Sequence, residues 1–387
     1  MAAFMVKLLQ FMLAKKRVVF LTGTRADFGK LKSLIEILRK SSSFEVHIFA
    51  TGMHMDMKYG FTVNEIEKCG YSNIYKYINH DSESSMDITL SRTIEGFANY
   101  IRLIQPDLII IHGDRIEALA GATVGALNNI LVAHIEGGEV SGTIDELIRH
   151  SVSKLSHSHF VANTEAKNRL LQMGEIEKSI FEIGSPDMDV MVSENLPHWD
   201  DLKKYYEIPF KKFAISMFHP VTTEVEMMDI YADNYVRALE ESNLNYIVIY
   251  PNNDKGSDFI LNKLLRLQTN DRFKVFPSVR FEAFLVMMKH ASFMAGNSSA
   301  GIREAPFYGI PTVNVGTRQN GRSNNSDIIN TSYEKDEIKT ALLKAVTHQV
   351  SNQHLFGDGK SDDKFFEILS NQAFWDISKQ KIFKDNI

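Results

Sequence analysis

The chain of 387 residues contains a single cysteine, Cys69, and only nine prolines. One thiol cannot form an internal disulfide, which fits a reducing compartment, and we therefore expect a cytoplasmic protein. No uninterrupted apolar run reaches the roughly 18 residues that read as a membrane-spanning helix. Neither sign of charge dominates, because 43 basic and 48 acidic side chains leave a net charge of −5. The composition therefore provides no general attraction for nucleic acid, and an anionic ligand would need a local basic pocket.

The first 14 residues are apolar enough to suggest a signal peptide, but their flanks do not fit one. Lys15, Lys16 and Arg17 follow the apolar run instead of preceding it, and no small-residue cleavage site stands before the first strand. We interpret residues 1–16 as a peripheral N-terminal extension of a soluble protein.

Strand-like and helix-like patterns alternate along the rest of the chain, which predicts parallel α/β architecture. A first series of about six strands occupies residues 17–193, and a second series of five follows a connector at 194–212. The economical arrangement is two Rossmann-like, doubly wound domains, 17–193 and 194–371, that face each other across a cleft. The remaining segment, 372–387, is expected to form a helix that packs back across the domain junction.

Two short apolar strands in the first series end in ionisable residues. The strand at 109–111 leads into Asp114 and Arg115, and the strand at 132–135 leads into Glu136 and Glu139. Ligands of open α/β sheets bind beyond the carboxyl ends of such strands. Asp145 opens the next helix close by. Carboxylates held on strand ends suit general acid–base chemistry on a small polar substrate.

The segment Gly23-Thr-Arg-Ala-Asp-Phe-Gly-Lys-Leu31 follows a strand and opens a helix, a place where backbone amides bind phosphate. Its spacing matches neither a nucleotide-hydrolase loop nor a dinucleotide fingerprint. Arg25 is suited to hold a pyrophosphate through two hydrogen bonds. The structural alternative is that Thr24 or Asp27 simply caps the helix.

The second domain offers its own candidates for an anionic ligand. His219 ends a strand, and Asn252 lies in a segment whose composition by itself indicates a turn. Ser298 and Ser299 stand at a helix start, where free amides and the helix dipole favour an anion, although they also suit a simple cap. Further candidates are Glu304, which is able to accept two hydrogen bonds from a ribose, and the cations Arg318 and Arg322.

Histidines are numerous, at positions 54, 112, 134, 150, 157 and 159, so a metal site has to be considered. No two of them form the spaced pair with a carboxylate on one helix face that zinc enzymes use. We expect no metal.

Taken together, these motifs resemble the hydrolysing UDP-N-acetylglucosamine 2-epimerases, which include bacterial sialic-acid enzymes and the epimerase half of a bifunctional animal enzyme. The resemblance covers about residues 17 to 375 and departs mainly at the N-terminal extension. It is carried by Gly23-Thr-Arg-Ala-Asp27, His112-Gly-Asp-Arg115, His134-Ile-Glu-Gly-Gly-Glu-Val-Ser-Gly-Thr143, Asp145 with Ile148-Arg-His150, His219-Pro-Val-Thr-Thr223, Gly296-Asn-Ser-Ser299 and Gly316-Thr-Arg-Gln319.

The resemblance implies a glycosyltransferase-B-like fold and conversion of UDP-N-acetylglucosamine and water into N-acetylmannosamine and UDP, without metal or nicotinamide. The implied path is an anti elimination to 2-acetamidoglucal followed by addition of water. It implies Asp114 and Glu136 as the acid–base pair, assisted by Asp145. The implied substrate contacts are Arg25, Arg115, His219, Ser298 and Ser299 at the diphosphate, Glu304 at the ribose, and Asn252 and Arg318 on the nucleotide side.

Three alternatives stay open. The same chemistry on a UDP-2,4-diacetamido-2,4,6-trideoxyglucose would serve legionaminic acid synthesis in place of sialic acid synthesis. A glycosyltransferase of the same two-domain build would transfer the sugar to an acceptor, and a non-catalytic protein would only bind the nucleotide sugar. The family resemblance also implies a homodimer or homotetramer, with the helices around residues 60–105 as a candidate interface.

Overall fold

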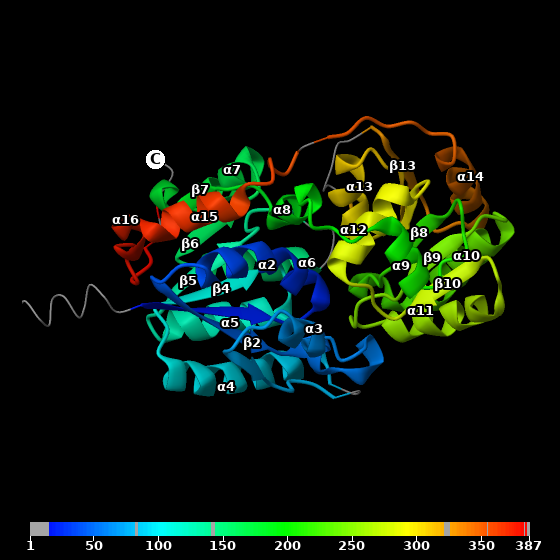
Figure 1. Ribbon diagram of the computed structural model, residues 1–387. Coiled ribbons are helices and arrows are strands. Elements are labelled where there is room, and N and C mark those ends of the chain that lie inside the picture. Colours follow the sequence, from blue (N-terminus) through cyan, green and yellow to red (C-terminus); the bar gives the residue numbers. More distant parts are fainter. Residues whose placement is uncertain are drawn as a thin grey trace, which may run out of the picture.

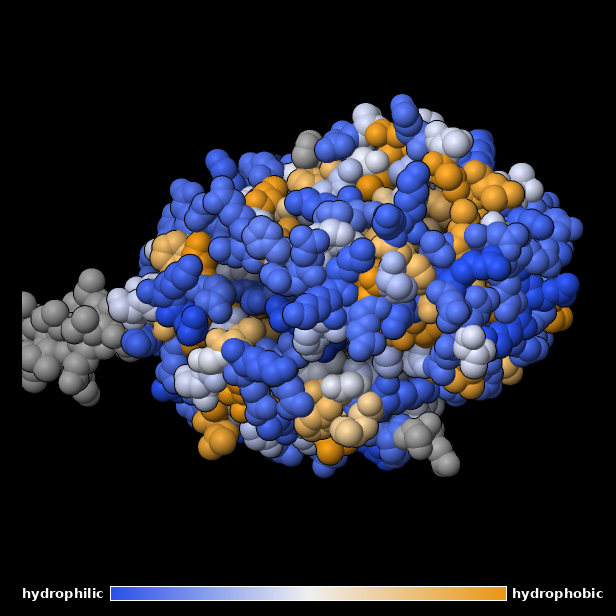
Figure 2. Space-filling view, turned by 45° about the vertical axis from the view of Figure 1, so that its right-hand side comes forward, coloured by the Kyte–Doolittle hydropathy of each residue, from blue (hydrophilic) through white to orange (hydrophobic). Residues whose placement is uncertain are grey.

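The computed structural model describes residues 15–81, 84–140, 144–320, 326–353, 355–382 and 384. The expected extension at 1–16 lies almost wholly outside these residues. The described chain forms two α/β domains (Figure 1). None of its helices is both long and apolar enough to cross a bilayer. On the face drawn in Figure 2, hydrophilic residues dominate and the hydrophobic ones gather in separate patches.

The first domain contains a seven-stranded parallel sheet in the order β3-β2-β1-β4-β5-β6-β7. Its strands are β1 (Lys16–Thr22), β2 (Phe44–Ala50), β3 (Ile74–Lys76), β4 (Leu108–His112), β5 (Leu131–Ile135), β6 (Ser158–Val161) and β7 (Ile180–Glu182). Its helices are α2 (Arg25–Arg39), α3 (Val63–Lys68), α4 (Met86–Ile104), α5 (Ile116–Leu127), α6 (Ile144–Leu155), α7 (Thr164–Gln172) and α8 (Pro186–Val192).

The second domain contains a six-stranded parallel sheet in the order β10-β9-β8-β11-β12-β13. Its strands are β8 (Ala214–Met217), β9 (Tyr246–Ile249), β10 (Phe273–Phe276), β11 (Met294–Gly296), β12 (Thr312–Val315) and β13 (Ile328–Thr331). The helices from the connector onward are α9 (Trp199–Tyr205), α10 (Met228–Glu241), α11 (Ser257–Leu264), α12 (Phe281–His290), α13 (Glu304–Phe307), α14 (Lys335–Ala345), α15 (Ser361–Ser370) and α16 (Gln372–Trp375). Short 3-10 turns are η1 (Gly52–Met55), η2 (Met57–Tyr59), η3 (Glu177–Ser179), η4 (Thr222–Met227), η5 (Leu265–Thr269) and η6 (Ser299–Gly301).

Both sheets are buried on both faces, which explains their apolar strands. In β4, residues 108–111 are fully buried, and all five residues of β5 are buried. Separate apolar clusters cover the two faces of each sheet. The two sheets share the doubly wound order 3-2-1-4-5-6, counting strands from the start of each domain, so each has its topological switch point between its first and fourth strands. The expected fold class is confirmed.

A glycine is required where the switch point of the second sheet is most crowded. Gly296 ends β11 with φ of 125°, and a Cβ there would lie 1.9 Å from the carbonyl oxygen of Met217 at the end of β8. Only glycine permits both this conformation and this approach. The tight junction brings His219 and Ser298, which follow these two strands, to the same edge.

The domain boundary expected at residue 371 is wrong. The chain returns to the first domain earlier, because Phe365 and Leu369 of α15 are buried in the core of the first sheet together with Phe374 of α16 (Figure 1). The boundary at 193 is not sharp either, since Met188 and Met191 of α8 pack in the core of the second domain. The strand count also differs, since β3 and β13 are additional strands.

Candidate active site

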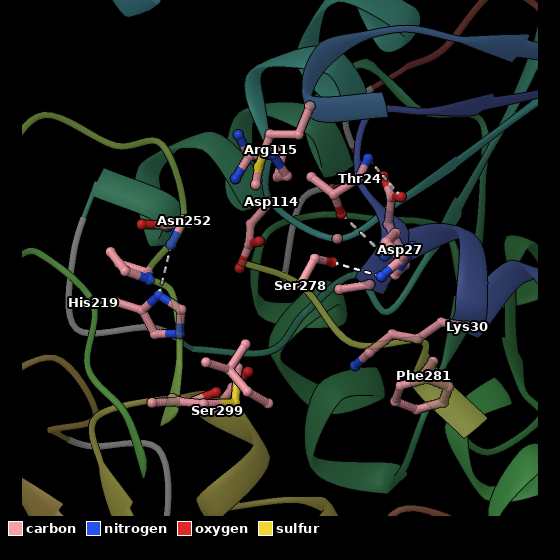
Figure 3. Close-up of a pocket in the computed structure, with 18 of the residues that line it drawn as sticks. Thr24, Asp27, Lys30, Asp114, Arg115, His219, Asn252, Ser278, Phe281 and Ser299 are labelled. Carbon is pink, nitrogen blue, oxygen red and sulfur yellow. Dashed lines mark hydrogen bonds between the residues drawn. The ribbon is translucent and has the colours of Figure 1, made fainter. Parts of the chain in front are cut away.

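A cavity of about 290 Å³ lies between the carboxyl edges of the two sheets. The first domain contributes Asp114 and Lys30, and the second contributes His219 and Ser299, all of which surround the same space (Figure 3). Ten of the eleven site residues expected from the sequence line it: Arg25, Asp114, Arg115, Glu136, Asp145, His219, Asn252, Ser298, Ser299 and Arg318.

Asp114 follows β4 through a turn at Gly113, whose φ is 72°. The carboxylate accepts a hydrogen bond from the guanidinium of Arg149, which belongs to α6 and is buried. Burial disfavours the charge of Arg149, but Asp114 and Glu139 raise its pKa above the ordinary value. His134 supports the same turn, because its Nε2 donates to the carbonyl of Gly113 at 2.7 Å. Arg149 of α6 therefore holds the Asp114 carboxylate, and His134 of β5 holds the turn that carries it.

Glu136 is held in an unusual backbone conformation at the end of β5. Its φ is 63°, a left-handed value that costs a non-glycine residue of the order of 1–3 kcal/mol and is found disproportionately at functional sites. Oε2 accepts a hydrogen bond from His112 Nε2 at 3.0 Å, and Oε1 contacts Arg303 and Ser185. Burial alone would raise the pKa of Glu136, but Arg303, Lys30 and His112 hold it well below the usual range. The side chain is therefore an ionised carboxylate with a fixed orientation.

Asp145 lies in the first turn of α6 and faces the second domain. Arg318 Nη2 donates a hydrogen bond to its Oδ2 at 3.1 Å. Asp145 thus brings a third carboxylate to the cavity, beside Asp114 and Glu136.

Arg25 and Arg115 also bridge the two domains. Arg25 Nη1 donates to Ser278 Oγ at 2.9 Å, and Arg115 Nη2 donates to Asn253 Oδ1 at 2.8 Å. With Arg318, they place three guanidinium groups on the cavity wall. A net acidic protein therefore offers a locally basic pocket, as a diphosphate ligand requires.

His219 is placed to donate a hydrogen bond from Nε2. The backbone amide of Asn252 donates to His219 Nδ1 at 3.0 Å, which leaves the ring proton on Nε2 (Figure 3). Asn297 fixes the main chain of His219 through two hydrogen bonds, of 2.6 and 2.9 Å. Burial, Arg318 and Arg115 lower the pKa of His219 well below its ordinary value, so the ring is neutral.

The structural alternative for the segment after β1 is confirmed. Thr24 and Asp27 form a reciprocal capping box at the start of α2, which was the structural alternative. Arg25, between them, nevertheless lines the cavity. Ser298 also combines two features, because its Oγ accepts from the amide of Ala300 at 3.3 Å while the residue lines the cavity.

Glu304 is not where the sequence suggested. It does not line the cavity, and its buried carboxylate faces Lys30, with Nζ 3.7 Å from Oε1. Burial raises the pKa of Glu304. Glu304 begins the short helix α13, which follows the 3-10 turn η6 that Ser299 begins. The residue next to Glu304, Arg303, reaches the cavity instead.

Sequence reasoning assigned no role to several residues of this site. Lys30 and Asp187 form an ion pair of 2.7 Å beside Glu136, and Arg303 and Ser185 contact Glu136 directly. Lys30 and Arg303 each belonged to a segment that had been singled out, at 23–31 and 296–304, and this was the signal available in the sequence. Apolar and small side chains complete the cavity wall, among them Met53, Met217, Ile249, Ser278, Val279, Phe281 and Phe284.

Within the described ranges, no group of three or more His, Cys, Asp or Glu side chains is placed to hold a metal ion. Several of the abundant histidines have structural partners instead. His54 lies between Thr22 and Thr62, and His159 contacts Glu175 at 3.0 Å.

Comparison with known proteins agrees with this arrangement. Residues 36–370 match the family model described as UDP-N-acetylglucosamine 2-epimerase. The chain is 50% identical over 374 residues to UDP-N-acetylglucosamine 2-epimerase of Neisseria meningitidis, covering 96% of this chain and 99% of the relative. It is 34% identical to UDP-N,N'-diacetylbacillosamine 2-epimerase (hydrolyzing) of Legionella pneumophila, covering 92% and 95%. The chain belongs to the UDP-N-acetylglucosamine 2-epimerase family.

The fold is shared with a solved structure as well. The structure of Methanocaldococcus jannaschii UDP-GlcNAc 2-epimerase in complex with UDP-GlcNAc and UDP superposes with a TM-score of 0.78 at 21% identity. The match covers 92% of this chain and 99% of that one. The two-domain architecture is therefore that of the family.

Proposed function

We propose that the chain is a hydrolysing 2-epimerase that converts UDP-N-acetylglucosamine and water into N-acetylmannosamine and UDP. One observation carries the proposal: three carboxylates of the first domain, Asp114, Glu136 and Asp145, line the same cavity as His219 and Arg318 of the second. The family and the 50% identity to a UDP-N-acetylglucosamine 2-epimerase support the sugar. Hydrolysis is supported by the resemblance described above and by the name of the Legionella relative.

The proposed reaction begins with elimination. A carboxylate removes the C2 proton, the electrons of that C–H bond form the C1–C2 double bond, and the C1–O bond breaks as its electrons leave with UDP. Water then adds to 2-acetamidoglucal, with its oxygen bonding to C1. A proton arrives at C2 on the face opposite to the one from which the first proton left, so C2 is inverted. These reaction steps transfer no hydride, so the reaction needs no nicotinamide. Each well-placed acid or base contributes roughly 10²–10⁴-fold to such a rate.

The cavity supplies a group for each demand of this reaction. Asp114 and Glu136 are the proposed acid–base pair, and Asp145 assists them. The leaving diphosphate is bound by the guanidinium groups of Arg25 and Arg115 and by the neutral imidazole of His219, which donates from Nε2. Donors that stabilise a departing charge are often worth as much as the acid–base groups. The proposed diphosphate contacts are Arg25, Arg115, His219, Ser298 and Ser299, with Asn252 and Arg318 on the nucleotide side.

The place of the reaction in metabolism follows from its product. N-acetylmannosamine is an N-acetylated hexosamine and a precursor of sialic acid, so we propose that the enzyme opens sialic acid synthesis. The second candidate keeps the chemistry but takes a UDP-2,4-diacetamido-2,4,6-trideoxyglucose, and the name of the Legionella relative favours it.

Proton NMR in heavy water tests the function. With UDP-N-acetylglucosamine we expect UDP release and N-acetylmannosamine that carries deuterium at C2. Release of sugar with the C2 proton retained, or turnover only with an added acceptor, would instead indicate a glycosyltransferase. Running the diacetamido sugar nucleotide in parallel decides the substrate, since the preferred sugar gives the higher kcat/KM.

A further inference from the structure

Arg303 belongs to the second domain, but its side chain ends inside the first. It directly follows the Ser298–Ser299 turn, and its amide donates to the carbonyl of Ser299 at 3.1 Å. Nη1 lies 2.6 and 2.7 Å from the two carboxylate oxygens of Glu139, and Nη2 donates to Ser185 Oγ at 2.6 Å and to Oε1 of Glu136. One guanidinium therefore connects the turn of one domain to the carboxylate of the other.

This guanidinium is almost completely buried, with 4% of the side chain exposed. A buried charge is tolerated only with close partners, and here Asp187 adds a third carboxylate 3.3 Å from Nη2. The guanidinium carbon of Arg303 lies over the ring of Phe356, 4.6 Å from the ring centre. Such complete enclosure leaves Arg303 little freedom to take another orientation.

The main chain of Glu136 is held without Arg303. Its amide donates to the carbonyl of Phe160 at 2.8 Å, and Arg149 Nη1 donates to its carbonyl at 2.7 Å. The carboxylate has a different set of partners, namely Arg303 and Ser185 at Oε1, and His112 with the more distant Lys30 Nζ (3.9 Å) at Oε2. Loss of Arg303 is therefore expected to change the carboxylate and to leave the left-handed backbone in place.

We propose that Arg303 is a positioning residue, which orients the Glu136 carboxylate for proton transfer and ties that orientation to the Ser298–Ser299 turn. The inference rests on the proposed function, because it assumes that Glu136 exchanges a proton with the substrate. Arg303 itself acts through Glu136. Its loss therefore affects kcat much more than UDP binding.

The test compares Arg303→Met and Arg303→Lys with a matched control. Lys32→Met removes another ion pair between the domains, to Glu282, from a position that does not line the cavity. We expect Arg303→Met to lower kcat by about 10²-fold, in the range of one acid–base group, with the UDP dissociation constant changed less than about threefold. Arg303→Lys retains the charge and should recover part of kcat, while Lys32→Met should leave kcat unchanged.

A pH profile separates positioning from a general structural effect. Arg303 helps to keep the pKa of Glu136 low, so its loss should move the acidic limb of the kcat profile to higher pH. A kcat within threefold of the parent, a parallel loss of UDP affinity, or an unmoved acidic limb overturns the proposal. If Arg303→Met does not fold, as judged by circular dichroism, Arg303→Lys and the double variant Arg303→Met/Glu139→Gln give the same comparison. Absence of UDP release by the parent enzyme would contradict the proposed function instead.

Discussion

Arg318 of the second domain donates a hydrogen bond of 3.1 Å to the carboxylate of Asp145 in the first. A proposed nucleotide contact and a proposed catalytic carboxylate are thus partners across the cavity. Arg25 and Arg115 bridge the same cavity to Ser278 and Asn253. A diphosphate that binds here has to share or replace these contacts, and its charge is opposed by that of Asp145.

Asp145→Asn should therefore strengthen UDP binding while it slows turnover. An ion pair of this partly buried kind contributes up to about 1 kcal/mol, so removing it should lower the dissociation constant roughly fivefold. Arg318→Met should raise the constant instead. Isothermal titration calorimetry with UDP measures both changes, and weaker binding by Asp145→Asn would contradict this account.

Asp114→Asn and Glu136→Gln should each lower kcat by roughly 10²–10⁴-fold, because each removes a proposed acid–base group. Deuterium incorporation at C2 should fall in parallel with UDP release. UDP affinity should stay close to that of the parent, since neither side chain is a proposed nucleotide contact. Persistent C2 exchange in both variants would show that another group removes the proton.

Binding of the substrate diphosphate should not depend on titration of His219. The pKa of His219 lies well below its usual value, so the ring stays neutral in the range where an ordinary histidine titrates. The KM values for UDP-N-acetylglucosamine of the parent and of His219→Asn should therefore follow parallel profiles between about pH 6 and 8. An inflection near pH 6.5 that only the parent shows would be incompatible with a neutral imidazole.

Glu175 should stabilise the first domain at neutral pH and lose this effect in acid. Burial would raise its pKa, but His159, Lys381 and Lys154 lower it to about 2. The unfolded chain has a glutamate pKa near 4.3, so the stabilisation is complete above that value and is lost as the pH falls toward about 2. Glu175→Gln should reduce the free energy of unfolding by roughly 1–3 kcal/mol at pH 7. Urea denaturation at pH 7 and pH 4 should show this deficit shrinking, and a constant deficit would argue against the ionised pair.

Phe365→Ala should destabilise the protein by roughly 3–5 kcal/mol, because it empties a fully buried position where α15 packs on the first domain. Phe366→Ala is the matched control, since the neighbouring ring is only partly buried. Urea denaturation measures both variants. Equal losses would mean that α15 is not anchored through Phe365.

The alternation of strand and helix patterns predicted two doubly wound domains because apolar strands of parallel sheets are recognisable locally. The pattern missed β3 and β13, because both are edge strands with partly exposed residues and neither forms a continuous apolar run. It also assigned α15 to the wrong domain. An amphipathic helix shows that it has a buried face but not which sheet covers it.

The sequence by itself determined which polar residues reach the cavity from the strand ends. The carboxyl ends of parallel strands share one edge, so residues that follow neighbouring strands meet there whatever the details of packing. This reasoning brought Asp114 and Glu136 together, and His219 with Ser298. Only the tertiary structure decided which side chains meet between the domains, because such contacts depend on how the two sheets face each other and on which charges remain buried. The pairing of Arg303 with Glu136 and the turning of Glu304 toward Lys30 are therefore not encoded in any local spacing.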